Sequence, residues 1–231
     1  MTSKVKLYPG TYKNYSEEIY KAIRNETFGE DIGQNSWLTA DEYREMFSLL
    51  GFTNKSSVLE IASGSGGPAI CMVKETGCHL TGLEYDKNGV DNSLKLADLN
   101  GLTGQTKFLH GDASEPLPFE DNSFDAVFTI DAINHLKNRD RVVNEFYRVL
   151  RAGGRLLYTD PIVVTGILTN EEIAVRSSIG YFLFTPLGEN EQLLERAGFT
   201  EIRSRDVTEN MSLVSQKWFN ARKKRQDELL T

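Results

Sequence analysis

The first residues in the chain that could do chemistry are the glycines and the carboxylate around a turn near residue 60. Residues 58–70 read VLEIASGSGGPAI, and Gly64, Gly66 and Ala69 match the G-x-G-x-x-G/A spacing of dinucleotide-binding loops. Glycines let the backbone approach a ligand closely, and the helix that follows offers free N–H groups at its start. Glu60 is unfavourable beside a pyrophosphate but suits an ammonium group. The loop therefore predicts a nucleotide-like cofactor, and its type depends on the residues that follow.

Two further carboxylates follow the next two strand candidates. Glu84 ends the second candidate, where a carboxylate accepts hydrogen bonds from a ribose diol. Asp112 follows the third, where it can accept from an exocyclic amine while Ala113 offers its N–H to a ring nitrogen. Asp112 could instead cap a turn. Together with Glu60, this set suits S-adenosylmethionine, which has no phosphate and carries an ammonium group.

The run TIDAINHLKN follows the fourth strand candidate, and ligands of open α/β sheets sit beyond the C-terminal ends of the strands. Asp131, Ala132 and His135 are therefore expected near the reacting end of the cofactor. His135 is either a general base or acceptor-orienting group, or a structural histidine. Tyr181 and Tyr20 either offer a hydroxyl to an acceptor or pack within their own segments. The predicted catalytic residues are His135, Tyr20 and Tyr181. The predicted cofactor-binding residues are Glu60, Ala62, Gly64, Gly66, Glu84, Tyr85, Asp112, Ala113, Asp131 and Ala132.

A parallel sheet is needed to bring these residues together. Apolar runs typical of strands alternate with patterns typical of helices along the middle of the chain. The strand candidates are 58–62, 79–85, 106–109, 124–130 and 155–160. The helix candidates between them are 68–76, 88–99 and 139–150. This order predicts an α/β fold of the Rossmann-like, doubly wound type, with a mostly parallel sheet and helices on both faces.

Both ends of the chain carry additional segments. Residues 1–52 are aromatic, lack a strand pattern and are predicted to form an N-terminal helical cap, in which Thr39, Glu42 and Gly51 have the spacing of a capped helix. Residues 53–231 form the second predicted domain. It is expected to contain an insertion at about 161–187, a helix at 189–197, a strand at 200–206 and a helical tail whose basic run is solvated.

Composition narrows the function classes. The 231 residues carry a formal net charge of −7, which argues against broad binding to nucleic acid or to an anionic membrane. No apolar leader pattern opens the sequence, and no apolar run has the length of a transmembrane helix. Cys71 and Cys78 lack metal-ligand spacing and are expected to be buried thiols. We therefore expect a cytoplasmic protein that contains no metal and acts as a monomer or homodimer.

Four motifs in order from Val58 to Asp160 resemble those of the class I S-adenosylmethionine-dependent methyltransferases. They are VLEIASGSG, TGLEYD, GDASEPLPFEDNSFDAVF and EFYRVLRAGGRLLYTD. That family commonly has Asp and Cys where Glu60 and Ser63 stand. The resemblance implies a seven-stranded sheet with an antiparallel last strand, but no final strand is evident after Asp206. The segment FGEDIGQNSW also resembles the cap of members that methylate phosphoethanolamine, sterols or quinones.

The resemblance implies in-line transfer of a methyl group from S-adenosylmethionine to a nitrogen, oxygen or carbon atom of a small-molecule acceptor. The protein then has to align acceptor and cofactor and exclude water, and it needs a base only where the acceptor loses a proton. Two alternatives remain open. One is an NAD(P)-dependent oxidoreductase, favoured only by the glycine spacing. The other is a non-catalytic partner protein that binds S-adenosylmethionine.

Overall fold

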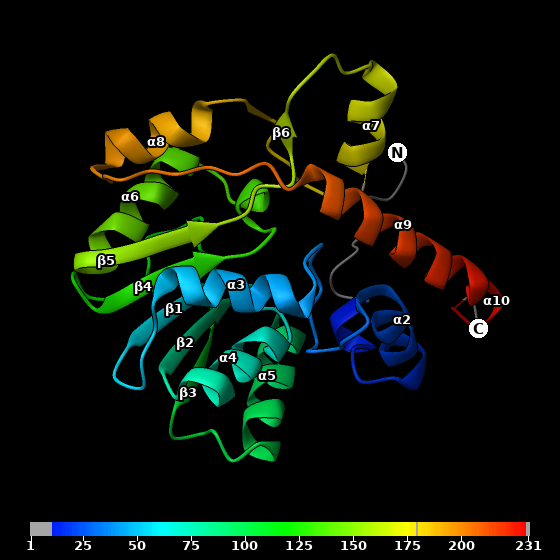
Figure 1. The fold of residues 1–231 in the computed structure, drawn as a ribbon, viewed down its shortest axis with the longest axis horizontal. Coiled ribbons are helices and arrows are strands. Elements are labelled where there is room, and N and C mark those ends of the chain that lie inside the picture. Colours follow the sequence, from blue (N-terminus) through cyan, green and yellow to red (C-terminus); the bar gives the residue numbers. More distant parts are fainter. Residues whose placement is uncertain (1–10, 179, 230–231) are drawn as a thin grey trace.

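The computed structural model describes residues 11–178 and 180–229, and its largest feature is one parallel sheet (Figure 1). The strands are β1 (Ser57–Ile61), β2 (His79–Glu84), β3 (Thr106–His110), β4 (Phe124–Thr129) and β5 (Leu150–Tyr158). Their order is β3-β2-β1-β4-β5, and every neighbouring pair is parallel. The order reverses between β1 and β4, so a crevice for a ligand is expected at the C-terminal ends of these two strands.

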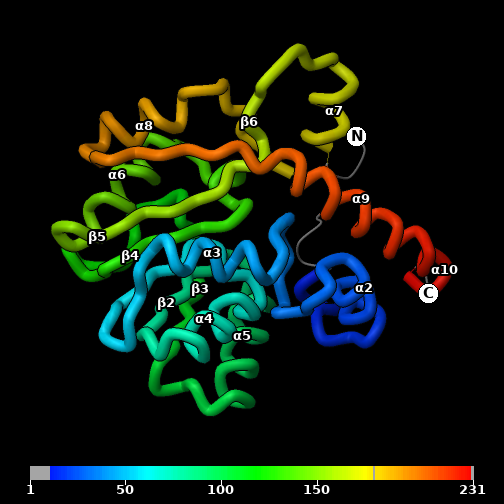
Figure 2. The backbone as a smooth tube through the Cα atoms, viewed as in Figure 1, coloured from blue at the N-terminus to red at the C-terminus, as the bar shows by residue number. Residues whose placement is uncertain are grey.

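Helices cover both faces of the sheet, as predicted. On one face lie α3 (Ala40–Leu50), α4 (Gly67–Thr76) and α5 (Lys87–Leu99), and on the other lie α6 (Arg139–Val149) and α8 (Glu189–Ala197) (Figures 1 and 2). Consecutive residues of β1 alternate between the two layers: Val58 packs in one apolar cluster with Phe47 of α3, and Leu59 packs in the other with Phe146 of α6. Burial of both faces explains why the central strands read as continuous apolar runs.

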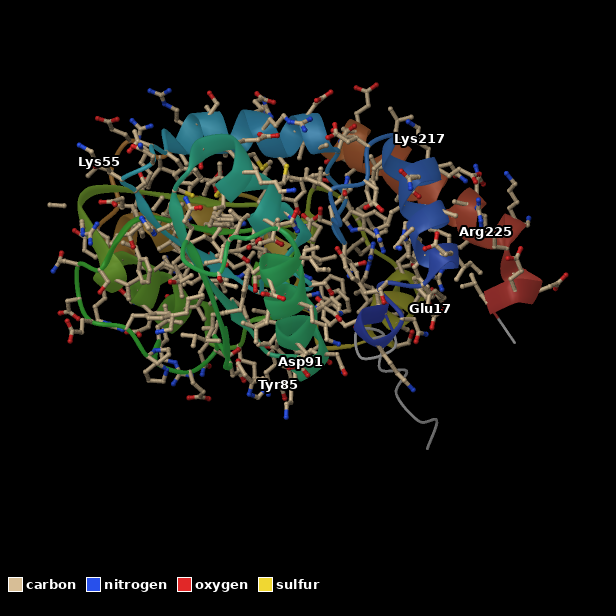
Figure 3. The ribbon with its side chains drawn as sticks, turned by 90° about the horizontal axis from the view of Figure 1, so that it is seen from below. Glu17, Lys55, Tyr85, Asp91, Lys217 and Arg225 are labelled. Carbon is tan, nitrogen blue, oxygen red and sulfur yellow. The ribbon has the colours of Figure 1, made fainter. Side chains whose placement is uncertain are left out.

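The N-terminal helix α2 (Glu18–Phe28) lies beside α9 (Thr208–Lys224), which is followed by α10 (Gln226–Leu229). Figure 3 shows the two at one end of the molecule, with Glu17 at the start of α2 and Arg225 at the end of α9. The Arg225 guanidinium lies 2.8 Å from the Glu26 carboxylate. Part of the basic run in the tail therefore fastens α9 to α2. Of the two cysteines, Cys78 is buried and Cys71 is only partly buried.

The predicted cap of α3 is confirmed. The Thr39 side chain accepts the N–H of Glu42, whose carboxylate accepts the N–H of Thr39, and Gly51 ends the helix with φ of 68°. Although α3 lies within residues 1–52, it packs against the sheet in the main core. The division of the chain at residue 52 stays a prediction.

The region after β5 differs from the expectation in two respects. In the described residues the sheet has five parallel strands, whereas the family resemblance implies seven with an antiparallel last strand. Residues 200–206, predicted as a strand, form an irregular segment between α8 and α9. Most of these side chains are exposed, and Arg205 bonds Glu45 at the surface, so the segment has too small an apolar face to join the sheet. The insertion contains β6 (Val163–Val164), α7 (Asn170–Ser178) and β7 (Thr185–Pro186), and β6 pairs with β7 in parallel.

Candidate active site

A cavity of about 590 Å³ lies at the C-terminal ends of the strands. The loops after β1, β2, β3 and β4 form one side, and residues from the N-terminal segment and the insertion form the other. Among the predicted site residues, all but Gly66 and Tyr20 line it. Those that do are Glu60, Ala62, Gly64, Glu84, Tyr85, Asp112, Ala113, Asp131, Ala132, His135 and Tyr181. The volume is in the usual range for sites of small molecules and cofactors.

The loop after β1 is held in a left-handed backbone conformation at alternate residues. Ala62, Gly64 and Gly66 have φ of 58°, 57° and 77°. At Gly66 a Cβ atom would lie only 2.7 Å from the hydroxyl oxygen of Ser93, so this glycine serves the close approach of α4 to α5. Gly64 faces the cavity and Gly66 faces away from it, although the two belong to one motif.

Glu84 braces the glycine loop in addition to lining the cavity. Its carboxylate accepts the N–H of Gly64 at 2.8 Å and the N–H of Asp86 at 2.7 Å. Burial raises the pKa of the Glu84 carboxyl, and these hydrogen bonds offset part of the rise. Each carboxylate oxygen has two lone pairs, so both can still accept a hydroxyl from a ligand.

Glu60 is a buried carboxyl with an unsatisfied oxygen. Within the described ranges Oε2 has no hydrogen-bond partner, and only 5% of the residue is exposed. Burial raises the pKa of Glu60 well above its usual value, and the neighbouring Glu84 charge adds to the rise. Glu60 lines the cavity, and a buried carboxyl oxygen without a partner in a lining residue suits a donor or a cation supplied by a ligand.

Asp112 and Ala113 follow β3 at the adjacent wall. Oδ1 of Asp112 accepts the N–H of Ser114 at 2.8 Å, which is the turn cap that the sequence offered as an alternative. The residue is nevertheless exposed to the cavity, next to the buried Ala113. Tyr85 is 71% exposed at the rim, on the side shown in Figure 3.

Asp131 joins the sheet to the N-terminal segment. Its Oδ2 accepts the backbone N–H of Trp37 at 2.7 Å, and its Oδ1 accepts the Thr159 hydroxyl at 2.6 Å. Burial raises the pKa of Asp131. The residue adopts φ of 53°, a conformation that non-glycine residues adopt only where the surroundings enforce it. This carboxylate thus ties residues 94 positions apart in the chain at the edge of the cavity.

His135 lies in a short 3₁₀ helix (Ile133–His135) after β4. Its Nδ1 is 2.9 Å from the carbonyl oxygen of Tyr181. Because a carbonyl only accepts, Nδ1 carries the proton, and the neutral ring presents Nε2 as the basic nitrogen. Burial lowers the pKa of His135 below 6.5, so the neutral form dominates at neutral pH. The phenol of Tyr181 itself is half exposed, 5.9 Å from the Lys137 ammonium group.

Tyr20 lies outside this cavity. It lines a second, very small one together with Tyr15, Arg24, Trp218 and Arg222, where α2 faces α9. Asn35 lines both cavities and separates them. The described geometry therefore does not place Tyr20 beside His135 and Tyr181.

Several lining residues were missed by sequence reasoning. They come from the N-terminal segment and include Tyr12, Gly33, Asn35, Ser36 and Tyr43. The hydroxyls of Ser36 and Tyr43 are 3.0 Å apart and both residues are buried. The signal for this group was the resemblance to a cap of the segment FGEDIGQNSW, which contains three of them, together with the tyrosines upstream of it, which include Tyr12.

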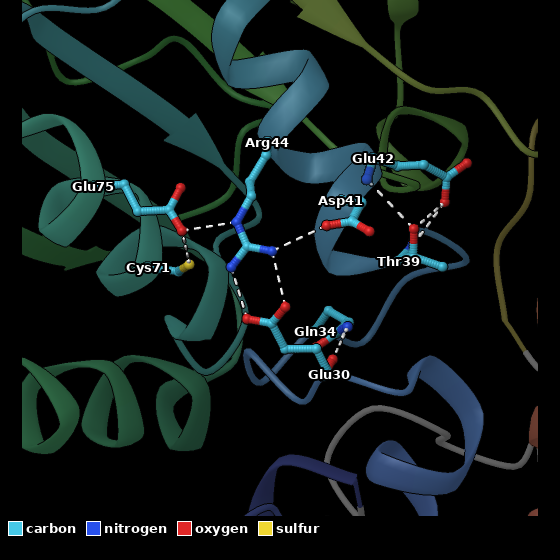
Figure 4. Close-up of polar contacts among 8 residues, drawn as sticks. All are labelled: Glu30, Gln34, Thr39, Asp41, Glu42, Arg44, Cys71 and Glu75. Carbon is cyan, nitrogen blue, oxygen red and sulfur yellow. Dashed lines mark hydrogen bonds and ion pairs between the residues drawn. The ribbon is translucent and has the colours of Figure 1, made fainter.

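The N-terminal segment is held in place by long-range contacts. The rings of Trp37 and Trp218 meet edge to face with centroids 5.9 Å apart. Figure 4 shows Arg44 of α3 bonding two oxygens of Glu30 and one of Glu75, which links the loop after α2 to α4. Among the described residues no group of three His, Cys, Asp or Glu side chains could hold a metal ion. No helix in the described ranges has the length and apolarity to cross a membrane.

Comparisons with known proteins agree with this geometry. Residues 59–158 match the family model described as a methyltransferase domain. The chain is 30% identical over 220 residues to sterol 24-C-methyltransferase erg-4 of Neurospora crassa, covering 90% of this chain and 57% of that protein. It is 26% identical over 200 residues to a glycine/sarcosine/dimethylglycine N-methyltransferase of Actinopolyspora halophila, covering 87% of this chain and 35% of that protein. The chain therefore spans less than two thirds of the length of these relatives.

A solved structure has the same fold. Phosphoethanolamine N-methyltransferase 2 of Haemonchus contortus, in complex with S-adenosyl-L-methionine, superposes with a TM-score of 0.79 and 23% sequence identity. The match covers 95% of this chain and 51% of that one. At this identity the likeness establishes a common fold, and it leaves the acceptor to be argued from the site.

Proposed function

The chain belongs to the class I S-adenosylmethionine-dependent methyltransferases, and we propose that it transfers a methyl group from S-adenosylmethionine to a nitrogen, oxygen or carbon atom of a small-molecule acceptor. One observation carries this proposal. The unpartnered, buried carboxyl of Glu60 shares a single cavity with the Gly64 turn and the Glu84 carboxylate. This combination fits a ligand that carries an ammonium group and a ribose but no phosphate.

The residues present fit S-adenosylmethionine along its length. Glu60 would hold the ammonium group, Glu84 the ribose hydroxyls, and Asp112 with the N–H of Ala113 the adenine edge. Ala62 and Gly64 would bring the backbone close to the ligand, and the rim and far wall would be completed by Tyr85, Asp131 and Ala132. When bound, this cofactor supplies a methyl group that is already activated by positive sulfur.

The residues on the acceptor side align and desolvate the reacting groups. Tyr12, Gly33, Asn35 and Ser36 cover the cavity from the N-terminal segment, which supports a role of that segment in excluding water. Nε2 of His135 would accept a proton where the acceptor has one to lose, because its ring is held neutral with the Nδ1 proton on the Tyr181 carbonyl. The phenol of Tyr181 would contact the acceptor at the mouth.

Several finer assignments belong to the same proposal. Residues 1–52 would act as a cap and residues 53–231 as the methyltransferase domain, with the insertion at about 161–187. The protein would work in the cytoplasm as a monomer or homodimer on a small molecule, without binding nucleic acid. The net charge of −7 supports the last point.

Calorimetric titrations of the protein with S-adenosylhomocysteine and with NADH test which cofactor it binds. We expect S-adenosylhomocysteine to bind and NADH not to bind. A second experiment incubates the protein with S-adenosylmethionine labelled in its methyl group and a panel of amines, alcohols and activated carbon acids. Binding without transfer to any of them would favour a non-catalytic partner protein, and a preference for NADH would favour an oxidoreductase.

A further inference from the structure

Arg139, the first residue of α6, forms a buried ion pair that the proposed chemistry does not use. Its Nη1 lies 2.6 Å from Oδ2 of Asp160, and the two side chains are only 7% and 3% exposed. The hydroxyl of Thr185 and Oδ1 of Asn190 also lie within hydrogen-bond distance of this nitrogen, so its two N–H groups are shared among three acceptors. Asn190 in turn donates to Asp160 at 3.1 Å. One cation therefore joins the ends of α6 and β5 to β7 and α8.

The insertion that Thr185 belongs to has little apolar burial of its own. Within the described residues, α7 contains no buried residue, and Ile167 and Val175 are 100% and 72% exposed. β6 and β7 pair through only two residues each. An element without an apolar core depends on its few polar anchors for a fixed position.

Those anchors lie close to His135. The N–H of Leu183 donates to the backbone oxygen of Asn134 at 2.8 Å, and the Tyr181 carbonyl accepts from Nδ1 of His135. The Phe182 ring is 4.6 Å from the imidazole, centroid to centroid. Residues 181–185 thus run from the histidine to the ion pair. A shift of this short stretch moves the partner that fixes the imidazole proton.

We propose that Arg139 and Asp160 form a latch that holds the insertion against the body of the protein and thereby orients His135 and the acceptor wall. Arg139 is a positioning residue, since its contact with the site runs through Thr185 and residues 181–183. The latch positions residues on the proposed acceptor side of the cavity and none on the proposed cofactor side. That the latch helps catalysis by orienting His135 rests on the proposed methyl transfer. That it holds the insertion in place does not depend on that proposal.

Nη1 of Arg139 makes all of these contacts, whereas its Nε and Nη2 are buried without a hydrogen-bond partner among the described residues. The pair is costly to desolvate, and buried ion pairs can often be replaced by apolar side chains without loss of stability. This allows stability and position to be separated. A double substitution, Arg139→Met with Asp160→Leu, removes both charges together and leaves no unpaired buried ion. It also removes the contacts with Thr185 and Asn190.

The test compares three proteins with the wild type. They are the double variant, Thr185→Val, which deletes only the hydroxyl on the insertion, and Arg196→Met as the matched control. Arg196 of α8 also connects α8 to α6, through Asp140, but at the surface, and it pairs with Glu189 within α8. Hydrogen exchange is measured by residue, the affinity for S-adenosylhomocysteine by calorimetry, and the His135 tautomer by nitrogen NMR, assigned with His135→Gln.

In the double variant we expect exchange in residues 161–178 to rise at least ~10-fold, because loss of the anchor leaves the insertion to open on its own. The His135 proton should shift from Nδ1 toward Nε2. Thr185→Val should move both readouts in the same direction by less, and Arg196→Met should move neither. The affinity for S-adenosylhomocysteine should change by less than about twofold, because the latch lies apart from the cofactor side.

An unchanged exchange rate and an unchanged tautomer in both the double variant and Thr185→Val would overturn the latch. So would a wild-type tautomer in a double variant that unfolds at the wild-type temperature, because the ion pair would then contribute neither to stability nor to the position of His135. Failure of the wild type to bind S-adenosylhomocysteine would count against the proposed function instead, since neither exchange nor the tautomer depends on it.

Discussion

The proposed cofactor side and the proposed acceptor side of the cavity are built in different ways. On the cofactor side, Glu60, Gly64, Glu84 and Asp112 each lie within a few residues of the end of a strand, so the sheet itself positions them. On the acceptor side, residues are positioned by contacts between segments far apart in the chain, such as Trp37 with Asp131 and Tyr181 with His135. The cofactor side is therefore fixed by the sheet, while the acceptor side depends on how peripheral segments dock.

This contrast predicts that substitutions will separate into two groups. Changes at strand ends should affect cofactor affinity, and changes in the docked segments should affect turnover and local opening. This division fits the proposed function, because one fold can host different chemistries while its framework stays the same. Variation in peripheral segments leaves the sheet intact.

The largest effect is expected at His135. If Nε2 is the base, His135→Ala should lower turnover by ~10²–10⁴-fold while the affinity for S-adenosylhomocysteine stays the same. The base works in its neutral form, so activity should fall as the pH drops through the pKa of His135. Because burial lowers that pKa, the acid limb should lie below 6.5. His135→Gln keeping most of the activity, with the acid limb intact, would reduce the residue to an orienting group.

Glu84→Ala should have the next largest effect, and it should act on cofactor affinity, since Glu84 lies on the proposed cofactor side of the cavity. The substitution removes the ribose acceptor and leaves the N–H groups of Gly64 and Asp86 without their partner, so cofactor affinity should fall by about 1.5–3 kcal/mol. Calorimetry with S-adenosylhomocysteine measures the loss. Asp91→Ala, on α5 close by in sequence and at the surface, is the control. Equal affinity of Glu84→Ala and wild type would show that the ribose lies elsewhere.

How much of this could be predicted from the sequence follows the same division. The strand-end residues were found because a strand, a turn and a helix start leave a local pattern, and the order of the strands places their ends together. The N-terminal segment was expected to cover the site, but Tyr12 and Tyr43 were not singled out, because no local pattern tells which of its side chains reach the cavity. Tyr20 was predicted into the site as a tyrosine of the N-terminal cap that could offer its hydroxyl to the acceptor, and α2 instead turns it toward α9.

The same reasoning explains the two smaller differences. Gly66 was assigned to the cofactor with Gly64, yet the Ser93 side chain occupies the space beside it, a contact that depends on α5. Residues 200–206 were predicted as a strand, but Ile202 is the only large apolar side chain among them, and a strand also needs a neighbour that offers free backbone groups. Here the chain crosses the surface between α8 and α9 without one.

A smaller effect is expected at Asp131, where the sides of the cavity meet. Asp131→Asn keeps the shape but weakens the hydrogen bond from the Trp37 N–H, at a cost of about 1 kcal/mol. In the wild type, residues 11–38 should become more protected from hydrogen exchange when S-adenosylhomocysteine binds. In the variant that added protection should shrink. Equal protection of the wild type with and without ligand would make the segment a static layer.

The smallest effect is expected at Arg44, whose contacts with Glu30, Asp41 and Glu75 are at the surface. Arg44→Met should lower the free energy of unfolding by less than about 1 kcal/mol, since exposed ion pairs contribute little and are screened by salt. Thermal unfolding in low and high salt checks this. A large loss that persists in high salt would mean that surface ion pairs, and not buried anchors, hold the N-terminal segment.

The role of Glu60 is tested most directly by calorimetry with two ligands. S-adenosylhomocysteine carries the ammonium group, and 5′-methylthioadenosine has the same adenosine and sulfur without it. Glu60→Gln should weaken S-adenosylhomocysteine by about tenfold or more, the loss expected for a hydrogen bond to a charged group, and leave 5′-methylthioadenosine unchanged. Equal losses for both ligands, or none for either, would contradict the placement of the cofactor in this cavity.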